Sequence, residues 1–319
     1  MVNGVFDKIK IFEKMEQDKT TISNSTSFAL AAKVKDYFQL IKFTLSFMVV
    51  FSTVVSYLIA TEYRNLPDVL LLFLAGMCIT GSANTINQVA EKDTDALMKR
   101  TASRPVASGR MSVNEATTFA VITGLAGLLI MLLRFNWQSS LIGLVSLFLY
   151  GFIYTPLKKV SSIAVLVGAF PGALPCLIGW VAAFYGSPIL WTGGCILFAI
   201  QFLWQFPHFW AIAWVAHQDY TKAGFKLLPS DKGPTKFTAL QTIIYSMLMV
   251  PVGVLPYFYS ISGAVSLWIV LGCNLWMVFV SVRLYVKMDV NSARRVMFSS
   301  YFYLAIVLLA LLADKVHYV

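Results

Sequence analysis

The sequence predicts an all-α membrane protein, a polytopic bundle of nine transmembrane helices, and two observations carry this prediction. Hydrophobic residues make up 58% of the chain and charged residues only 13%, whereas soluble domains carry about 25% charged residues. The apolar residues also gather in repeated runs of roughly 20, the length that crosses a hydrocarbon core about 30 Å thick.

The nine expected spans follow one another closely along the chain. They cover residues 37–60, 68–90, 113–133, 138–156, 162–184, 188–215, 236–258, 261–286 and 296–313. The connections are too short for a separate soluble domain, so residues 37–313 are expected to form one intramembrane domain. Residues 1–36 form a polar N-terminal segment, and residues 314–319 form a short C-terminal tail.

The polar N-terminal segment helps to predict which membrane contains the protein. It contains no charged stretch followed by an apolar run and a small-residue cleavage site, so no cleaved signal peptide is expected. Its acids, Asp7, Glu13, Glu16 and Asp18, argue against a mitochondrial presequence, which is normally poor in acids. They favour a bacterial inner (plasma) membrane over a mitochondrial inner membrane.

Positive charge is concentrated in alternate connections. The net charge is +10, and the bases lie in residues 92–110, 158–159, 222–236 and 287–295, while the opposite connections hold only Arg64 and Arg134. Cytoplasmic loops of membrane proteins carry such an excess of Lys and Arg. We therefore expect a cytoplasmic N-terminus and an external C-terminal tail, and no nucleic-acid partner is needed to explain the charge.

The stretch NTINQVAEKDTDALMKRTASRP, residues 84–105, ends the second span with an unusual density of acids. Asn87, Glu91 and Asp95 are spaced at i, i+4 and i+8, which puts them on one face if the helix continues, with Asp93 on another face. Oxygen ligands of this kind suit Mg²⁺, which proteins hold through one or two carboxylates plus substrate phosphates. The alternative is that these residues only mark a helix leaving the membrane. Ionisable groups at this depth are functional candidates by default.

Bases follow these acids at once: Lys99, Arg100 and Arg104. Arg offers a bidentate fork to phosphate and Lys a point charge, so a metal beside them predicts a site for a phosphorylated anion. The chain has no P-loop and no GxGxxG before a helix, so a nucleotide-binding fold is not indicated. Lys158, in YTPLKKVSS (154–162), emerges on the same side as an orientation signal or as a further diphosphate ligand.

The sixth span combines polar and aromatic residues in FLWQFPHFWAIAWVAHQDYTKAGFKLLP, residues 202–229. Pro207 frees a backbone carbonyl and predicts a kink. His208 is either a packed, hydrogen-bonded residue or a functional one. Asp219 and Tyr220 lie at the cytoplasmic end, where an acid would meet the same cation and a Tyr would serve equally as an interface anchor.

Five runs of the sequence carry a resemblance to a known family. They are MKRTASRP (98–105), YTPLKK (154–159), GAFPGALPCLIGW (168–180), WQFPHFW (204–210) and DYTKAGFKLLP (219–229). These runs resemble the heme O synthase (protoheme IX farnesyltransferase) family, and the Asn87–Asp95 spacing resembles the first metal motif of its intramembrane aromatic prenyltransferase superfamily. The resemblance covers most of residues 37–313, in the family's order, and implies a nine-helix bundle.

The resemblance implies an activity and roles for the residues above. A farnesyl group passes from farnesyl diphosphate to a vinyl group of heme B, with addition of water, giving heme O and diphosphate. Mg²⁺ on the catalytic residues Asn87, Glu91 and Asp95 would neutralise the diphosphate. Lys99, Arg100, Arg104 and Lys158 would hold the diphosphate, and the heme or substrate would lie against Tyr154, Trp204, Gln205, His208, Asp219 and Tyr220. Heme A synthase or oxidase assembly proteins are the implied partners, together with the lipid bilayer.

Two departures from the pattern and two other classes of protein remain open. Glu91 stands where the superfamily commonly has Asp, and Val215 and Ala223 occupy the positions four residues from Asp219 where a second metal would need an acid. One alternative is another intramembrane prenyltransferase with a quinone-precursor or chlorophyll-type acceptor. The other is a polytopic transporter, although no inverted repeat or paired broken segments, the usual pointers to one, are found.

Overall fold

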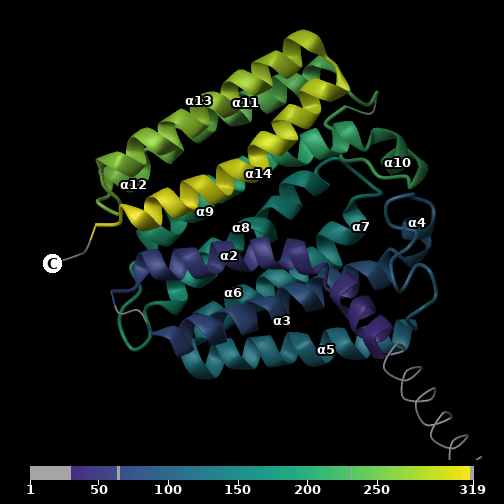
Figure 1. Ribbon diagram of the computed structural model, residues 1–319, viewed down its shortest axis with the longest axis horizontal. Helices are drawn as coiled ribbons and strands as arrows, with labels where there is room; N and C mark the ends of the chain where they lie inside the picture. The colour runs from purple at the N-terminus through teal and green to yellow at the C-terminus, as the bar shows by residue number, and fades with distance from the viewer. Residues whose placement is uncertain (1–29, 63–64, 231, 317–319) are drawn as a thin grey trace, which may run out of the picture.

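The structure, a computed structural model, describes residues 30–62, 65–230 and 232–316 (Figure 1). Within these ranges, nine helices are long and apolar enough to cross a membrane, so the chain is a multi-pass integral membrane protein and the predicted all-α fold is confirmed. The main helices of these spans are α2 (Phe43–Ala60), α3 (Leu66–Ala90), α5 (Val113–Ile130), α6 (Trp137–Phe148), α8 (Ala164–Ala182), α9 (Trp191–Val215), α11 (Lys236–Gly253), α13 (Ala264–Lys287) and α14 (Val290–Ala313). Three of them are continued by short elements, which extend the span from α5 to Phe135, the span from α6 to Leu157 and the span from α11 to Phe258.

Shorter elements extend or connect these helices. Two are π-helical, η1 (Met131–Phe135) and η2 (Leu149–Tyr154), and the others are α4 (Lys92–Ala96), α7 (Thr155–Leu157), α10 (His217–Lys222) and α12 (Leu255–Phe258). Residues 1–29 of the predicted N-terminal segment and residues 317–319 of the predicted tail lie outside the described ranges.

Two predicted span ends are wrong, each for a local reason. The first span starts at Phe43 instead of residue 37, because Lys42 adopts a left-handed conformation (φ 49°) that interrupts the preceding helical residues 30–40. The ninth starts at Val290 instead of residue 296, because the Asp289 carboxylate accepts a hydrogen bond from the Ser292 N–H (2.6 Å) and caps the helix. The connection before α14 is therefore very short.

Helices α8 and α9 occupy the middle of the bundle. In the most apolar stretch of each span, 67% of the residues of α8 and 56% of those of α9 are buried. The corresponding share for the span that contains α6 is 17%. Gly179 of α8 makes this burial possible, because a Cβ at that position would lie 1.9 Å from the Thr53 carbonyl oxygen of α2. Small residues let membrane helices approach closely in this way.

Prolines inside these helices leave carbonyl groups without their usual partners. Pro175 has no N–H to donate to the Pro171 carbonyl, and the Ser146 hydroxyl of α6 donates to that oxygen instead (3.2 Å). Helix α9 runs from Trp191 to Val215 as one element, so the predicted kink at Pro207 does not interrupt it.

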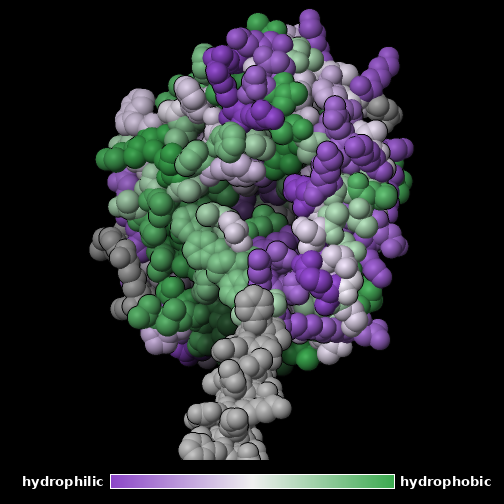
Figure 2. All heavy atoms as spheres, turned by 45° about the vertical axis from the view of Figure 1, so that its right-hand side comes forward, coloured by the Kyte–Doolittle hydropathy of each residue, from purple (hydrophilic) through white to green (hydrophobic). Residues whose placement is uncertain are grey.

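The polar short helices gather at one end of the bundle. Helices α4, α7 and α10 lie together on the right of Figure 1, and α12 and the C-terminal residues lie at the opposite end. Figure 2 brings the right-hand end forward and shows hydrophilic residues gathered beside a hollow in the surface, with hydrophobic residues on its other side. This end holds the acids and bases that the sequence singled out.

Candidate active site

The end of α3 and the start of α4 present the three predicted metal-binding residues on one buried face. Asn87, Glu91 and Asp95 are only 1%, 4% and 0% exposed, whereas Asp93 is exposed. The predicted continuous helix is wrong, because Glu91 adopts φ −103° and ψ 12° and separates α3 from α4, a sparsely allowed conformation. The Glu91 and Asp95 N–H groups still donate to the carbonyls four residues earlier (3.0 and 2.7 Å), so the predicted facing is preserved.

Each residue on this face contacts a base from another part of the chain. The Lys42 Nζ donates to the Asn87 Oδ1 (2.8 Å), and the Arg104 Nη1 donates to the Asp95 Oδ2 (2.6 Å). The Lys158 Nζ forms an ion pair with the Glu91 Oε1. Two of these bases therefore pair with carboxylates, whereas Lys42 contacts an amide, and burial lowers the pKa of Lys42 well below its usual value.

The oxygen atoms of this face fit a hard cation. The Asp95 Oδ1 is buried, and no residue in the described ranges donates a hydrogen bond to it. A buried carboxylate oxygen without a partner is costly, and a cation would satisfy it. In the described part of the chain, no three His, Cys, Asp or Glu side chains form a metal-binding group, so the donor set is two carboxylates and the Asn87 amide.

The four predicted diphosphate-binding bases divide into two groups. Arg104 and Lys158 reach the carboxylates, as described above. Arg100 is exposed and instead donates to the Tyr220 hydroxyl (3.2 Å), with its guanidinium 5.8 Å from the Tyr220 ring. Lys99 is also exposed, and in the described ranges it makes no hydrogen bond or ion pair with the carboxylates.

Lys158 is enclosed by aromatic rings as well as by Glu91. Its Nζ lies 4.9 Å from the Tyr154 ring and 5.0 Å from the Phe225 ring. Burial lowers the pKa of Lys158 from its usual value, and the Glu91 carboxylate opposes that shift. The Lys226 N–H donates to the Lys158 carbonyl (2.7 Å), which brings the loop after α10 over the site.

Sequence reasoning missed three contributors to the site. Lys42 is a base at the edge of an apolar span. Its position indicates a functional role, because ionisable groups in such segments are functional candidates by default. Thr155 accepts from the Asn87 Nδ2 (3.2 Å) and donates to the Tyr150 carbonyl (2.8 Å). Tyr150 lies in the π-helical turn η2 and Thr155 directly follows it. Such turns recur at functional sites, and apolar periodicity does not predict them.

A second cluster surrounds His208 in α9. The His208 ring stacks on Trp204 (centroids 4.7 Å apart, planes at 18°) and meets Tyr301 edge-on (5.1 Å). The His208 Nδ1 lies 2.8 Å from the Ser300 Oγ, whose own proton goes to the Met297 carbonyl (2.6 Å). Ser300 therefore accepts from Nδ1–H, which leaves the His208 Nε2 as the unprotonated nitrogen.

Two of the predicted substrate-binding residues, Gln205 and Asp219, form no hydrogen bond or ion pair with the cation face in the described part of the chain. The Gln205 Nε2 donates to the Ala169 carbonyl of α8 (3.0 Å), and its side chain lies against Gly172, so Gln205 joins α8 to α9. Asp219 is half-buried in α10 and does not combine with Glu91 and Asp95 into a three-acid group within the described ranges. Within the described ranges, no ion pair or side-chain hydrogen bond joins Asp219 to the predicted cation face.

Comparison with known proteins identifies the family. A model of the UbiA prenyltransferase family matches residues 49–307. The chain belongs to the UbiA prenyltransferase family. This membership makes the chain an enzyme, a membrane prenyltransferase, and excludes the transporter alternative.

Two bacterial relatives are similar to the chain over nearly its whole length. The chain is 44% identical to a protoheme IX farnesyltransferase of Cytophaga hutchinsonii over 291 residues, covering 90% of this chain and 100% of the relative. It is 42% identical to the protein of the same name from Flavobacterium psychrophilum over 88% of this chain and 94% of that one.

Two solved UbiA-type structures share the fold. A structure of digeranylgeranylglyceryl phosphate synthase matches with a TM-score of 0.74 and 22% identity, covering 89% of this chain and 98% of that one. A UbiA homologue from Archaeoglobus fulgidus bound to GPP and Mg²⁺ matches with a TM-score of 0.63 and 16% identity, covering 86% and 99%. These identities are low, so the likeness to the solved structures concerns the fold alone.

Proposed function

We propose that this UbiA-family enzyme transfers a farnesyl group from farnesyl diphosphate to a vinyl group of heme B, with addition of water, to give heme O and diphosphate. The observation that carries the proposal is the likeness, over most of both chains, to bacterial proteins named protoheme IX farnesyltransferase. The described site offers the two kinds of group that this reaction needs, a polar anion site at the membrane edge and a buried aromatic cluster around a His.

The diphosphate would bind at the face of Asn87, Glu91 and Asp95. Mg²⁺ on these oxygens would neutralise the diphosphate and stabilise the charge that develops on the leaving group. A UbiA homologue with the same fold has been solved with GPP and Mg²⁺, which supports a divalent ion of this kind here.

Arg104 and Lys158 would turn from the carboxylates, and Lys42 from the Asn87 amide, to the diphosphate oxygens. Lys42, Arg104 and Lys158 come from separate segments, so they surround the anion from several sides. Fixed charges aimed at the leaving group lower the barrier because they need no reorganisation during the reaction. The Tyr154 ring beside Lys158 presents a face that attracts the allylic cation.

His208 would bind the heme iron through its Nε2. Neutral imidazole is a common haem ligand, and a ligating His usually donates its other N–H to a fixed acceptor, the role that the Ser300 Oγ fills at 2.8 Å. Trp204 stacks on the same ring and its Nε1 donates to the Ser300 carbonyl (2.8 Å), which holds both side chains in place.

The enzyme would work in a bacterial plasma membrane with its diphosphate site on the cytoplasmic side. The relatives named above are bacterial, and the base-rich connections share the end of the bundle that holds Glu91 and Asp95. Heme A synthase or oxidase assembly proteins are the partners that we propose for the heme O product.

One assay tests the proposed activity. Purified protein is incubated with Mg²⁺, farnesyl diphosphate and heme B, and the heme pool is read by mass spectrometry. We expect a heme carrying one farnesyl group and one added water, and its formation should stop when EDTA removes the metal. Unchanged heme together with prenylation of a hydroxybenzoate acceptor would overturn the proposal in favour of a quinone-precursor prenyltransferase.

A further inference from the structure

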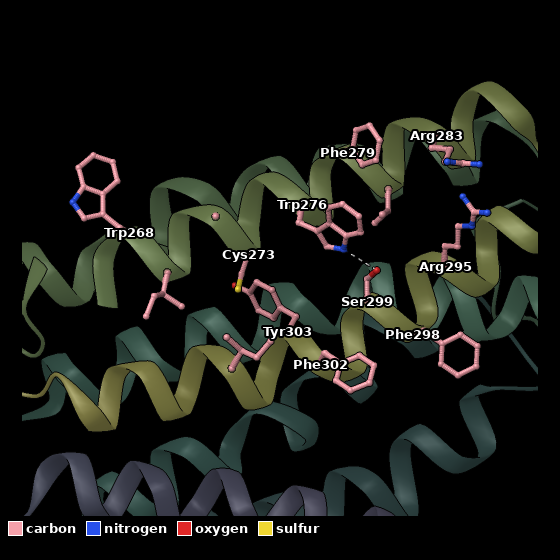
Figure 3. Close-up of a pocket in the computed structure, with 14 residues that line it drawn as sticks. Trp268, Cys273, Trp276, Phe279, Arg283, Arg295, Phe298, Ser299, Phe302 and Tyr303 are labelled. Carbon is pink, nitrogen blue, oxygen red and sulfur yellow. Dashed lines mark hydrogen bonds between the residues drawn. The ribbon is translucent and has the colours of Figure 1, made fainter. Parts of the chain in front are cut away.

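A groove of about 630 Å³ runs between α13 and α14 (Figure 3). Its volume falls within the range of roughly 300–1,000 Å³ that is typical of ligand sites. Five of the side chains that line it are aromatic and more than half exposed, so they face outward: Trp268, Trp276 and Phe279 from α13, Phe298 and Phe302 from α14. The groove is therefore an apolar channel on the outside of the bundle.

Two arginines close the groove at its base-rich end. Arg283 of α13 and Arg295 of α14 point toward one another in Figure 3. The Arg283 Nε is buried and has no hydrogen-bond partner in the described ranges, and neither arginine forms an ion pair with a described residue. Asp289, the acid in the connection between the two helices, already caps α14. The hydrogen bonds to Ser292, and then the nearby charges of Lys287 and Arg283, lower the pKa of Asp289, but in the described ranges no anion contacts either guanidinium directly.

We propose that this groove binds one anionic phospholipid, with its phosphate between Arg283 and Arg295 and an acyl chain along the aromatic wall. Arginine recognises phosphate through paired hydrogen bonds, and the buried Arg283 Nε supplies a donor that needs such an acceptor. From Arg283 to Trp268 the groove extends roughly 22 Å, at about 1.5 Å per residue, enough for an extended chain. Basic pockets between membrane helices on the cytoplasmic side bind anionic head groups in this way.

Two other occupants fit the geometry less well. A heme seated here would be separated from His208 by α14, because Ser299 accepts from the Trp276 Nε1 (3.0 Å) on the groove side while the adjacent Ser300 contacts His208 on α9. A second copy of the chain, packed symmetrically, would bring another arginine pair against the first. A lipid phosphate meets neither obstacle.

The test compares lipid retention by matched variants. Detergent-purified full-length protein is titrated with phosphatidylglycerol or with phosphatidylcholine of the same acyl chains, and bound lipid is counted by native mass spectrometry. We expect the double variant R283Q/R295Q to bind phosphatidylglycerol about 30-fold more weakly, from the usual attraction of two basic residues for anionic lipid. The control K287Q/R294Q removes two exposed bases that do not line the groove and should keep the affinity.

A second variant tests the groove without changing its charge. Gly272 lines the groove, and a Cβ there would meet no atom within 4 Å, so Gly272→Leu fills the channel in a helix that tolerates Leu well. It should weaken phosphatidylglycerol binding at least tenfold. The proposal would be overturned if the unchanged protein bound the two lipids with equal affinity, or if the two double variants lost affinity equally. It would also be overturned if Gly272→Leu lost heme binding, read at the Soret band, but kept phosphatidylglycerol binding.

Discussion

The Lys158 ammonium is paired with the Glu91 carboxylate although both side chains lie almost wholly inside the protein, with 9% and 4% of their surface exposed. The pair joins the residue after α7 to the junction between α3 and α4. Because neither charge is well solvated, each depends on the other. The contact holds the Glu91 carboxylate in place within the cation face.

Removing one member of this pair should destabilise the protein. Lys158→Gln leaves a buried carboxylate without its partner, which typically costs about 3–5 kcal/mol, so we expect a lower thermal unfolding midpoint without Mg²⁺. The exposed neighbour Lys159 supplies the control, Lys159→Gln, with an expected change within about 0.5 kcal/mol. The double variant E91Q/K158Q should recover part of the loss. Identical unfolding of the two single variants would show that the pair contributes nothing.

Loss of the Asp95 charge should be far more damaging than loss of the Asp93 charge. Asp95 is fully buried with one unpartnered oxygen, whereas Asp93 is exposed. We expect Asp95→Asn to reduce turnover at saturating Mg²⁺ by a factor of about 10²–10³. Asp93→Asn should change it by less than about fivefold, since an exposed charge is worth about 1 kcal/mol or less. Equal losses at the two positions would contradict the assignment of the cation face.

Lys42 should influence metal binding although it is not a ligand. Its Nζ donates to the Asn87 Oδ1, and groups that orient a metal ligand typically contribute about 10–100-fold to metal affinity or activity. Lys42→Met, which keeps an unbranched side chain one atom shorter and removes the ammonium group, should raise the Mg²⁺ concentration needed for half-maximal turnover by such a factor. Lys35→Met is the control, because Lys35 is exposed. If both variants need the same Mg²⁺ concentration for half-maximal turnover, the role of Lys42 is only to form the left-handed turn before α2.

His208 should separate heme binding from farnesyl diphosphate binding. His208→Ala removes the Nε2 that we assign to the iron, while the bases at Asn87, Glu91 and Asp95 stay in place. Heme affinity, measured at the Soret band, should fall steeply, and binding of radiolabelled farnesyl diphosphate should change little. Ser300→Ala, which removes the hydroxyl that accepts from the His208 Nδ1–H, should weaken heme binding about 10–100-fold. Normal heme binding and conversion by His208→Ala would make His208 a packing residue.

The membrane orientation can be tested with reporter fusions. The alternation of basic connections predicts that fusions after Arg110 and Lys232 read cytoplasmic and that a fusion at Val319 reads external. With nine crossings the two ends must lie on opposite sides of the membrane. A cytoplasmic reading at Val319 would mean that the number of crossings is even.

The residues that share a helix face could be predicted from the sequence alone. The spacing of Asn87, Glu91 and Asp95 predicted a shared face, and it holds even though Glu91 ends α3, because hydrogen bonds four residues apart bridge the junction. Helical phase depends only on neighbouring residues. The left-handed turn at Lys42 and the cap at Asp289 are also local, but both interrupt an apolar pattern that hydropathy alone reads as continuous.

The sequence by itself determined the class of protein, the number of spans in the described ranges and the shared face of Asn87, Glu91 and Asp95. A bilayer leaves the backbone few ways to satisfy its polar groups, so length and hydropathy suffice to predict spanning helices. The tertiary structure alone decided which base meets which acid: Lys42 with Asn87, Lys158 with Glu91, and Arg104 rather than Lys99 with Asp95. These pairs join segments as many as 67 residues apart, and their contacts depend on how helices pack, which no local periodicity encodes.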